Sequence, residues 1–465
     1  MASFTITTYT NTAQTLVDFD YGLITQTGTL NGFGSAVSVS NSGAGIAKLT
    51  VLGTLISQTN SASGKAVNFT GAEFNMYIGT GATVLTPGLG SIGIYLDATD
   101  KVLIANNGSI FSTLYAIQSR SGDSYSGFNL LNTGTITSGL TAIDFVDQAG
   151  VAKILNSGTI IGSDYGINNV SGVANAHLTI LDNTGTIQGA TASYVGSDGI
   201  DKIYNSGTMS GAIDLKDGND LYIGRSGNVV GPVAGGGGDD KLVGGTDDDT
   251  FQGDAGNDIL NGNDGDDSLS GGSDDDILRG GQGNDLLDGG LGNDDLLGGS
   301  GDDFLWGGDG NDTLKGGAGD DEMLGDLGSD SLTGGAGNDF LSGDAGKDYL
   351  GGGAGDDYLD GGANRDFLEG GRGDDILTGG GGRDDFIFNR NAGNDRITDF
   401  KNGTDKIDLS AFGINPADYA TTIAPALSNA GGGDTFLDLS ALGGQGSVLI
   451  EGLAFSEADL TDFIL

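Results

Sequence analysis

Two hydrophobic patterns follow one another along the chain. In residues 20–233, short runs rich in Ile, Val, Leu and Thr alternate with Asn-Gly or Ser-Gly dipeptides, and units such as "NTGTI" and "NSGTI" return every 20 to 28 residues. β-Branched residues between turn dipeptides are typical of short strands. A repeat of this length with two or three strands predicts a parallel β-helix of about nine coils, with apolar side chains stacked inward and Asn and Thr side chains in ladders.

The second pattern has a strict period of nine residues. From Gly235 to Ile387 the chain reads G-G-x-G-x-D-x-U-x seventeen times without an insertion, with Leu, Phe or Met at position eight. Glycine at positions one, two and four allows a tight turn with positive φ. Positions seven to nine are then predicted to form a minimal strand whose central side chain enters the core. Two nonapeptides complete one flattened coil, so each copy is expected to lie over the second copy after it.

Seven copies depart from this pattern at position two or position four, where glycine is less strictly kept than at position one. Asp and Asn tolerate left-handed backbone better than other residues with a side chain, so these copies are expected to keep the turn. Position four differs at Asp247, Asp274 and Asn364, and position two differs at Asp254, Asn263, Asp326 and Asp344. Coils beside the three position-four departures are expected to bind metal more weakly.

Position six is aspartate in all seventeen copies. In the predicted coil, carboxylates such as those of Asp339 and Asp357 face each other across one gap between turns, together with backbone carbonyls. A site made of oxygens suits calcium, which takes roughly 6 to 8 oxygen ligands, better than magnesium with its tight octahedron. Without cysteine and with a single histidine, the chain offers no thiolate or imidazole cluster for zinc or copper. Alternate copies leave at most about 15 such gaps.

This tract resembles the calcium-binding repeats of the RTX (repeats-in-toxin) family, whose members Gram-negative bacteria secrete. The resemblance covers residues 235–387 and implies a calcium-dependent parallel β-roll. It also implies that the position-six aspartates are calcium ligands, namely Asp240, Asp249, Asp258, Asp267, Asp276, Asp285, Asp294, Asp303, Asp312, Asp321, Asp330, Asp339, Asp348, Asp357, Asp366, Asp375 and Asp384.

Charge is distributed unevenly. The formal net charge is -45, and residues 211–465 hold 52 acidic and 13 basic side chains. Such a surface repels nucleic acid and anionic lipid, and no apolar run is long enough for a membrane helix. Without calcium, packed carboxylates repel one another and ordering glycine is costly in entropy. We therefore expect the repeats to be unfolded without metal and to fold on binding it.

The C-terminal region has a third pattern. The segment "DRITDFKNGTDKIDLS", Asp395–Ser410, is similar to the cap that follows the repeats in serralysin-type proteases, and the final "EADLTDFIL" resembles the uncleaved signal of type I secretion through an ABC exporter. The first residues contain no signal-peptide core. We therefore expect an extracellular or cell-surface protein of a Gram-negative bacterium. The expected domains are a β-helix (1–233), a β-roll (234–388) and a β-rich cap with the secretion signal (389–465).

The N-terminal pattern resembles the β-helices of bacterial autotransporters and surface adhesins. It implies an adhesin, a matrix protein or an S-layer-like structural module, with a cell-surface glycan or matrix as partner. The alternative is a β-helical polysaccharide lyase, epimerase or hydrolase, and the RTX-bearing alginate epimerases are similar through the nonapeptides. For this alternative Asp144, Asp201 and Asp214, which each follow an isoleucine, are expected to lie in one line. Metalloprotease and nucleotide-binding motifs are missing, and the one histidine is His177.

Overall fold

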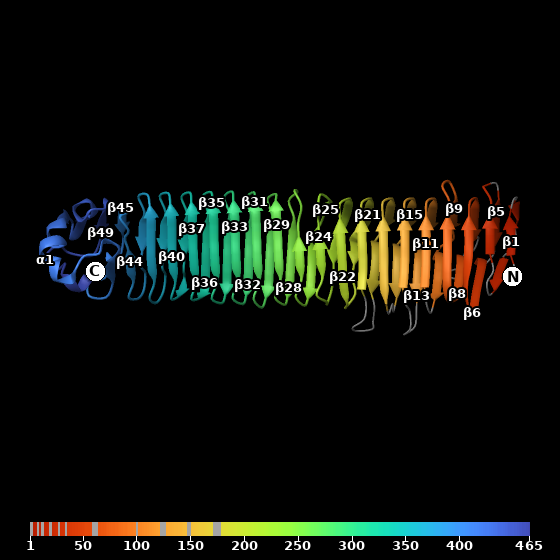
Figure 1. The fold of residues 1–465 in the computed structure, drawn as a ribbon, viewed down its shortest axis with the longest axis horizontal. Helices are drawn as coiled ribbons and strands as arrows, with labels where there is room; N and C mark the ends of the chain where they lie inside the picture. The colour runs from red at the N-terminus through yellow and green to blue at the C-terminus, as the bar shows by residue number, and fades with distance from the viewer. Residues whose placement is uncertain are drawn as a thin grey trace. The chain divides into compact units, whose positions relative to one another are not determined.

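The computed structural model describes residues 3–6, 9–10, 14–17, 21–26, 28–32, 35–57, 64–98, 101–120, 127–146, 150–170 and 178–465. These residues form two compact units, the first made of residues 1–246 and 250–253 and the second of residues 247–249 and 254–465. Both units are parallel β-solenoids (Figure 1), so the predicted all-β fold with a β-helix and a β-roll is confirmed. No helix among the described residues is long and apolar enough to span a membrane.

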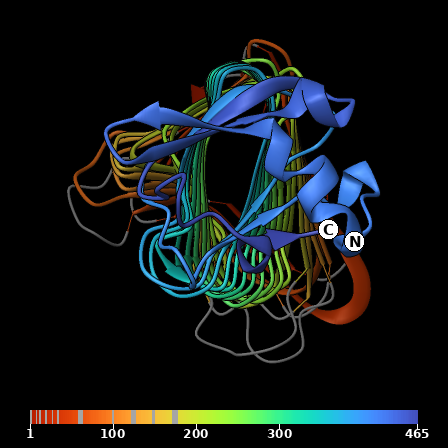
Figure 2. The ribbon, with the colours of Figure 1, turned by 90° about the vertical axis from the view of Figure 1, so that its left-hand side faces the viewer.

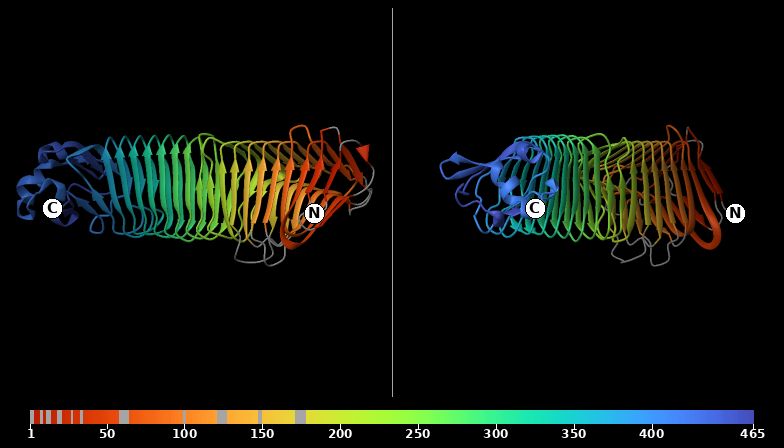
Figure 3. Two further views of the ribbon diagram at one scale, coloured as in Figure 1. Left: turned by 45° about the vertical axis from the view of Figure 1, so that its right-hand side comes forward. Right: turned by 60° about the vertical axis from the view of Figure 1, so that its left-hand side comes forward.

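The strands of the first unit stack in parallel in both views of Figure 3. They are β1 (Ser3–Ile6), β2 (Tyr9–Thr10), β3 (Gln14–Val17), β4 (Tyr21–Ile24), β5 (Thr29–Gly32), β6 (Ser35–Val51), β7 (Thr54–Ser57), β8 (Lys65–Ile78), β9 (Thr83–Thr86), β10 (Ile92–Ala98), β11 (Lys101–Asn106), β12 (Ser109–Ser112), β13 (Tyr115–Arg120), β14 (Gly127–Asn132), β15 (Thr135–Ser138), β16 (Thr141–Val146), β17 (Val151–Asn156), β18 (Thr159–Gly162), β19 (Tyr165–Val170), β20 (Leu178–Asn183), β21 (Thr186–Val195), β22 (Ile200–Asn205), β23 (Thr208–Asp214), β24 (Leu221–Ile223), β25 (Asn228–Val230), β26 (Val233–Gly237) and β27 (Lys241–Val243). Strand β28 (Thr250–Ala255) includes residues of both units.

Coils from β11 to β19 carry three strands each. Strands β11, β12 and β13 pair in parallel with β14, β15 and β16, which pair in turn with β17, β18 and β19. Their inward side chains stack in register, so that Ile104 lies beside Leu130 and Leu130 beside Ile154, all of them buried. This alternation of buried and exposed positions is what the Ile, Val and Leu pattern predicts for a strand with one face in the core.

A ladder of buried asparagines runs along one turn of these coils. The side-chain amide of Asn106 donates to Asn132, that of Asn132 to Asn156, and that of Asn156 to Asn183, each at 2.8 Å. The amide of Asn183 donates to Asn205 at the same distance. An amide has both a donor and an acceptor, so each asparagine satisfies its neighbours inside the core. The predicted asparagine ladder is therefore confirmed.

The coils change from three strands to two at β21. This strand pairs with both β18 and β19, which belong to separate sides of the preceding coil. From here each strand pairs with the second strand after it in the chain, β20 with β22 and β22 with β24. Two sides of the preceding coil thus merge into the one longer strand β21 before the nonapeptides begin.

The second unit is made of two-strand coils and ends in a cap. Its elements are β29 (Ile259–Asp264), β30 (Ser268–Ser273), β31 (Ile277–Gln282), β32 (Leu286–Leu291), β33 (Asp295–Ser300), β34 (Phe304–Asp309), β35 (Thr313–Ala318), β36 (Glu322–Gly328), β37 (Ser331–Ala336), β38 (Phe340–Ser342), β39 (Ala345–Gly346), β40 (Tyr349–Ala354), β41 (Tyr358–Asp360), β42 (Phe367–Arg372), β43 (Ile376–Thr378), β44 (Asp385–Ile387), β45 (Asn391–Ile397), β46 (Lys406–Asp408), β47 (Leu427–Gly431), β48 (Asp434–Asp438), β49 (Gln445–Ile450), β50 (Phe463–Ile464), α1 (Tyr419–Thr422) and five short 3-10 helices, η1 (Ser410–Phe412), η2 (Pro416–Asp418), η3 (Ala424–Ala426), η4 (Leu439–Leu442) and η5 (Leu460–Asp462).

Each nonapeptide lies over the second copy after it, as predicted. Leu278 pairs with Leu296 and Leu296 with Leu314, a step of 18 residues, and the leucines form a buried column. Seen along the stack in Figure 2, these repeats superpose.

The repeat strands are longer than predicted, and the expectation of a three-residue strand is wrong for most copies. In β31 and β33 the pairing skips position one and resumes at position two, where Gly281 pairs with Gly299. Both glycines have positive φ, near 124° and 123°, and so return the chain to the sheet after one residue of each strand is left unpaired. The strand therefore extends from position seven to position three of the next copy.

The cap begins by extending the stack. Strands β45 and β46 pair in parallel with the last repeat strands, β43 and β44. Strand β49 pairs with β45 and also lies antiparallel to β48, which pairs with β47. The cap thus closes the edge of the stack with an antiparallel hairpin. The predicted domain boundaries at 233 and 388 stay a prediction.

The asparagine ladder predicts a local loss of stability in Asn132→Ala. The change removes the acceptor of one N–H of the Asn106 amide, which keeps its bond to the carbonyl of Thr135, and it removes the side-chain donor to Asn156. Each such loss costs roughly 1 to 3 kcal/mol. Hydrogen exchange of peptides from β11 to β20 should show a lower opening free energy. Asn129→Ala, on the exposed side of the same strand, is the matched control and should change stability by less than about 0.5 kcal/mol. Equal effects of the two changes would contradict the ladder's role.

Candidate metal centre

All seventeen position-six aspartates lie where the turn enters the strand, and their side chains are buried, with at most 8% exposed. Alternate copies place them in two columns, because each copy lies over the second copy after it. Within the second unit one column runs from Asp249 to Asp375 and the other from Asp258 to Asp384, each in steps of 18 residues.

One oxygen of each carboxylate is held by the backbone of the preceding coil. The backbone N–H of Asp321 donates to Oδ1 of Asp339, and the N–H of Asp339 donates to Oδ1 of Asp357, both at 2.9 Å. The carboxylates of successive coils therefore stack through a backbone amide and do not simply face each other across an open gap. This contact fixes where the second oxygen points.

The second oxygen, Oδ2, is buried and has no hydrogen-bond partner in any of the fourteen position-six aspartates from Asp267 to Asp384. Burying an acceptor of a charged group without a partner is costly, and for a carboxylate the cost is severe. A row of such atoms at one place in every repeat therefore indicates that a cation completes them. Donor type fits calcium, because the surroundings supply oxygen alone.

Glycine at position one leaves room at this place. A Cβ at Gly334 would overlap Oδ2 of Asp339 and would lie 2.6 Å from the carbonyl oxygen of Gly352 in the next coil. The carboxylate oxygen and the carbonyl oxygen thus converge beside a position that a side chain would fill. This explains why position one is glycine in every copy.

Backbone oxygens are essential to such a site. Within the part of the chain that the structure describes, no group of three or more His, Cys, Asp or Glu side chains is placed to hold a metal ion. A cation at these turns would therefore take its remaining ligands from carbonyls such as that of Gly352. That each of the seventeen aspartates binds calcium, and how many sites are filled, stays a prediction.

Burial changes the acidity of these carboxyl groups. Desolvation raises the pKa of Asp366 to about 7, and the carboxylates of Asp348 and Asp384 add to the rise. Burial raises the pKa of Asp267 to about 7 in the same way, and it raises the pKa of Asp339. The metal-free stack is thus a place where carboxylates hold protons close to neutral pH.

The aspartate columns are longer than the seventeen copies. The N–H of Asp375 donates to Oδ1 of Asp395, and that of Asp384 to Asp405, both at 3.1 Å. At the other end the N–H of Asp220 donates to Oδ1 of Asp240 at 2.7 Å. Sequence reasoning missed these residues because the spacing becomes 20 or 21. The remaining signal is G-x-D followed by an apolar residue two positions later, as in "GNDRI" and "GTDKI".

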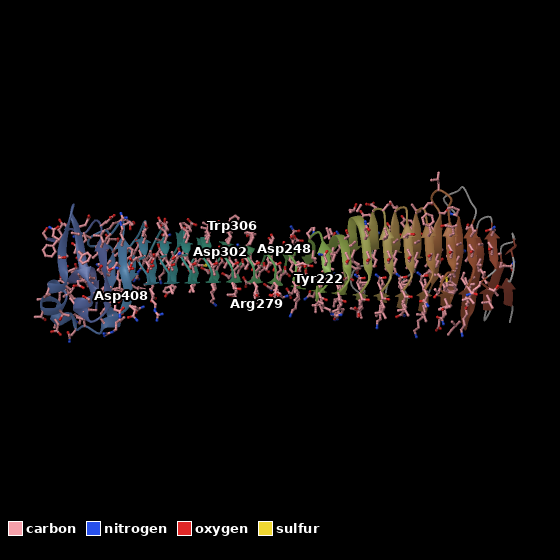
Figure 4. The ribbon with its side chains drawn as sticks, turned by 90° about the horizontal axis from the view of Figure 1, so that it is seen from above. Tyr222, Asp248, Arg279, Asp302, Trp306 and Asp408 are labelled. Carbon is pink, nitrogen blue, oxygen red and sulfur yellow. The ribbon has the colours of Figure 1, made fainter. Side chains whose placement is uncertain are left out.

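Position five forms a second ladder on the exposed side of the turns. The N–H of Asp320 donates to Asp302 at 2.9 Å, and the N–H of Asp302 donates to Asn284 at 3.0 Å. Asp248 accepts from the N–H of Asp266 in the same way, and Figure 4 labels both Asp248 and Asp302. These acidic side chains therefore serve as turn acceptors.

Six of the seven substituted glycine positions keep a turn with positive φ, as predicted, and Asp247 does not. Positive φ occurs at Asp254, Asn263, Asp274, Asp326, Asp344 and Asn364, with values from 58° to 87°. The left-handed conformation costs less conformational free energy for Asp and Asn than for other residues with a Cβ.

The aspartates considered for polysaccharide chemistry do not form one line. Asp144 lies in register between Gln118 and Asn168, and both amides donate to it, at 2.7 and 3.0 Å. Asp214 lies on the same side of the coils as Asp144, three rungs beyond it, after Asn168 and Val195. The expectation is wrong for Asp201, because it lies on β22 and pairs with Thr179. His177 lies outside the described residues.

Filling the space beside Oδ2 should weaken calcium binding. Gly334→Ala places a methyl group against Asp339 and Gly352, so we expect a higher calcium concentration at the folding midpoint, by about tenfold or more. Gly351→Ala is the matched control, because a Cβ there makes only ordinary contact with Tyr349. Calcium titrations followed by circular dichroism would compare the two. Equal midpoints would contradict the proposed position of the ion.

The raised pKa values set the sign of a pH effect. A folded stack whose carboxyl groups have pKa values of about 6 to 7 binds protons that the unfolded chain, with ordinary values near 4, has released. Without metal, lowering the pH from 8 to 5 should therefore increase β structure. With calcium, the apparent affinity should fall by about tenfold per pH unit below 7 for each proton displaced. A metal-free chain that loses β structure on acidification would contradict this.

Comparisons with known proteins agree with this geometry. The RTX calcium-binding nonapeptide repeat, in a form that spans four copies, matches residues 234–269, 261–296, 288–323, 297–332, 324–359, 351–386 and 360–397. The chain is similar to the solution structure of a subunit of the mannuronan C5-epimerase of Azotobacter vinelandii, with 30% identity, 33% of this chain and 80% of that chain covered, and a TM-score of 0.22.

A second similar structure is the extracellular lipase of Serratia marcescens, with 17% identity and a TM-score of 0.20. The match covers 63% of this chain and 40% of the lipase. The comparison with curated proteins gives no match. The repeat match, the 18-residue register and the buried aspartate columns lead to one conclusion. This chain carries RTX calcium-binding nonapeptide repeats over residues 234–397.

Proposed function

We propose that the protein is secreted, that its repeats fold when they bind calcium outside the cell, and that its β-helix is an adhesive or structural module of the cell surface. The observation that supports it most is the row of fourteen buried Oδ2 atoms without hydrogen-bond partners. A stack that buries so many unpaired acceptors is unstable until cations complete them.

Charge balance supports a folding switch. Residues 211–465 carry 52 acidic and 13 basic side chains, a charge of about -39 that about 15 calcium ions would largely neutralise. Extracellular calcium modules bind with dissociation constants of roughly 10⁻⁴ to 10⁻³ M, far above cytosolic calcium. The repeats would therefore stay unfolded inside the cell, which suits passage through a type I ABC exporter of a Gram-negative bacterium.

The outer face of the β11, β14 and β17 sheet is the proposed adhesive surface. Leu103 and Leu131 are 44% and 42% exposed there. They lie in a shallow groove of about 500 Å³, which is lined by Glu73, Asn75, Lys101, Val102, Leu103, Asn129, Leu130, Leu131, Lys153 and Leu155. Asparagine amides suit sugar hydroxyls, and apolar side chains suit the faces of sugar rings.

The lysines that line this groove indicate which kind of glycan it would bind. Residues 1–210 hold only 6 basic side chains, and two of them, Lys101 and Lys153, line this groove. Lys202 on β22 lies two rungs beyond Lys153 in the same column, about 10 Å away along the stack. A row of cations on an otherwise acidic protein favours an acidic glycan, whose carboxylates pair with the lysines.

Calcium should increase the β signal in the spectrum of the purified chain, because the repeats change from coil to β while the asparagine-ladder coils are ordered without metal. We expect circular dichroism and hydrogen exchange to report ordering of the repeats within the low millimolar range, because the carboxylate columns need divalent cations. Magnesium at equal concentration is the control and should order them much less. If calcium up to about 10 mM leaves the spectrum unchanged, the folding switch is wrong.

Acidic glycan binding should depend on the groove lysines. Lys101→Ala with Lys153→Ala should weaken binding of the calcium-loaded protein to polyuronate beads by about tenfold, and the effect should shrink at high salt. Lys315→Ala, on an exposed position of repeat strand β35, removes the same charge elsewhere and should leave binding unchanged. Equal loss in both variants, or no binding by the unmodified protein, would refute the acidic-glycan proposal.

A further inference from the structure

Two segments ahead of the matched repeats keep the nonapeptide pattern in weakened form. Gly196–Tyr204 reads "GSDGIDKIY" and Leu215–Ile223 reads "LKDGNDLYI". Both have glycine at position four, aspartate at position six and an apolar or aromatic residue at position eight. They lie inside the first unit and before residue 234, where the repeat match begins.

Asp220 has the same surroundings as the repeat aspartates. Its Oδ1 accepts from the N–H of Asp201 at 2.7 Å, and its own N–H donates to Asp240 at 2.7 Å. The side chain is 3% exposed, and its Oδ2 has no hydrogen-bond partner. Lys216, at position two of this segment, has a positive φ of 77°, as the repeat residues at that position do. The turn is therefore built like a calcium turn, although lysine replaces glycine.

Asp201 begins this column, and a vacant space lies beside it. A Cβ at Gly196 would overlap Oδ2 of Asp201 and the carbonyl oxygen of Leu215. Gly334 has the same two neighbours in the repeats, a carboxylate oxygen five residues later and a carbonyl of the next coil. The second segment thus supplies the carbonyl oxygen that the repeats take from position one.

Oxygen atoms gather at this end of the column. Asp201 is fully buried, its Oδ2 accepts from the N–H of Ser197 at 3.0 Å, and the side chains of Thr179 and Tyr194 also bond its carboxylate. The next carboxylate of the column, that of Asp220, has a buried Oδ2 without a partner. That unpaired oxygen, beside the carboxylate of Asp201 and the carbonyl of Leu215, favours a cation.

The place in the fold suggests what the ion does. Strand β21 ends at Val195, directly before the first of the two segments, and it is the strand that merges two sides of the coil. The chain there bends into β22 through four residues, Gly196–Gly199. Metal bound at this turn would fix the first two-strand coil.

We infer that Asp201 and Asp220, with the carbonyl of Leu215, hold a calcium ion inside the first unit, ahead of the nonapeptide repeats. This inference rests on the proposed calcium-dependent folding and extends it to residues that the repeat match does not cover. The coils from β21 to β24 are then ordered by calcium, whereas the asparagine-ladder coils before them are not.

Hydrogen exchange of the full-length chain tests this. Peptides covering residues 186–223 should exchange at least tenfold more slowly in 5 mM calcium than in chelator, and magnesium should not replace calcium. Peptides from β11 to β17 should change little. Asp201→Asn and Asp220→Asn should abolish the calcium effect on residues 186–223 while the protection of residues 267–384 by calcium remains.

Asp198→Asn is the matched control, because its side chain is exposed in the same turn and it removes the same charge. It should keep the calcium effect. If residues 267–384 respond to calcium and residues 186–223 do not, this inference is wrong and the proposed function stands. If neither region responds, the proposed function itself fails. The unmodified chain alone gives the calcium effect on residues 186–223 and on residues 267–384. The test therefore still decides the question if a variant does not fold.

Discussion

The structure of the repeats depends on one unfavourable arrangement, a carboxylate oxygen buried without a donor. Each position-six aspartate uses Oδ1 to bind the backbone of the coil before it, and this bond holds Oδ2 in place beside a glycine. Protein groups do not complete Oδ2 in the fourteen copies from Asp267 to Asp384. The strands can pair well and the leucines can pack, yet the stack has a cost at every turn that only a proton or a cation removes.

Two buried polar columns of the chain are satisfied in opposite ways. Asparagine carries a donor and an acceptor, so each side chain of the ladder from Asn106 to Asn205 bonds the next. Aspartate carries acceptors only, so the second oxygens of its ladder need a proton or a cation as partner. The choice between two side chains of nearly equal size thus decides whether a column is completed by the chain itself or is open to metal.

Much of this could be predicted from the sequence, because period and composition report directly on a solenoid. The leucine column, the 18-residue register and the buried aspartates follow from the strict nonapeptide. The skipped pairing at position one could not be predicted, since it depends on the backbone angles of Gly281 and its equivalents. Asp220, Asp395 and Asp405 were missed because inserted residues break the period, although the stack absorbs them in its loops. The merging of two sides in β21 leaves no periodic signal at all.

The ladders at positions five and six run in opposite directions. At position six the N–H of one coil binds the side chain of the next, whereas at position five the N–H of the next coil binds the side chain before it. A bare end of the stack thus presents both a free donor and a free acceptor, spaced for an incoming turn of the same kind. Such an end is a template for growth, and another chain could satisfy it as well as its own. Strand β49 pairs in parallel with β45 and antiparallel with β48, so this hairpin occupies the edge at which such growth would begin.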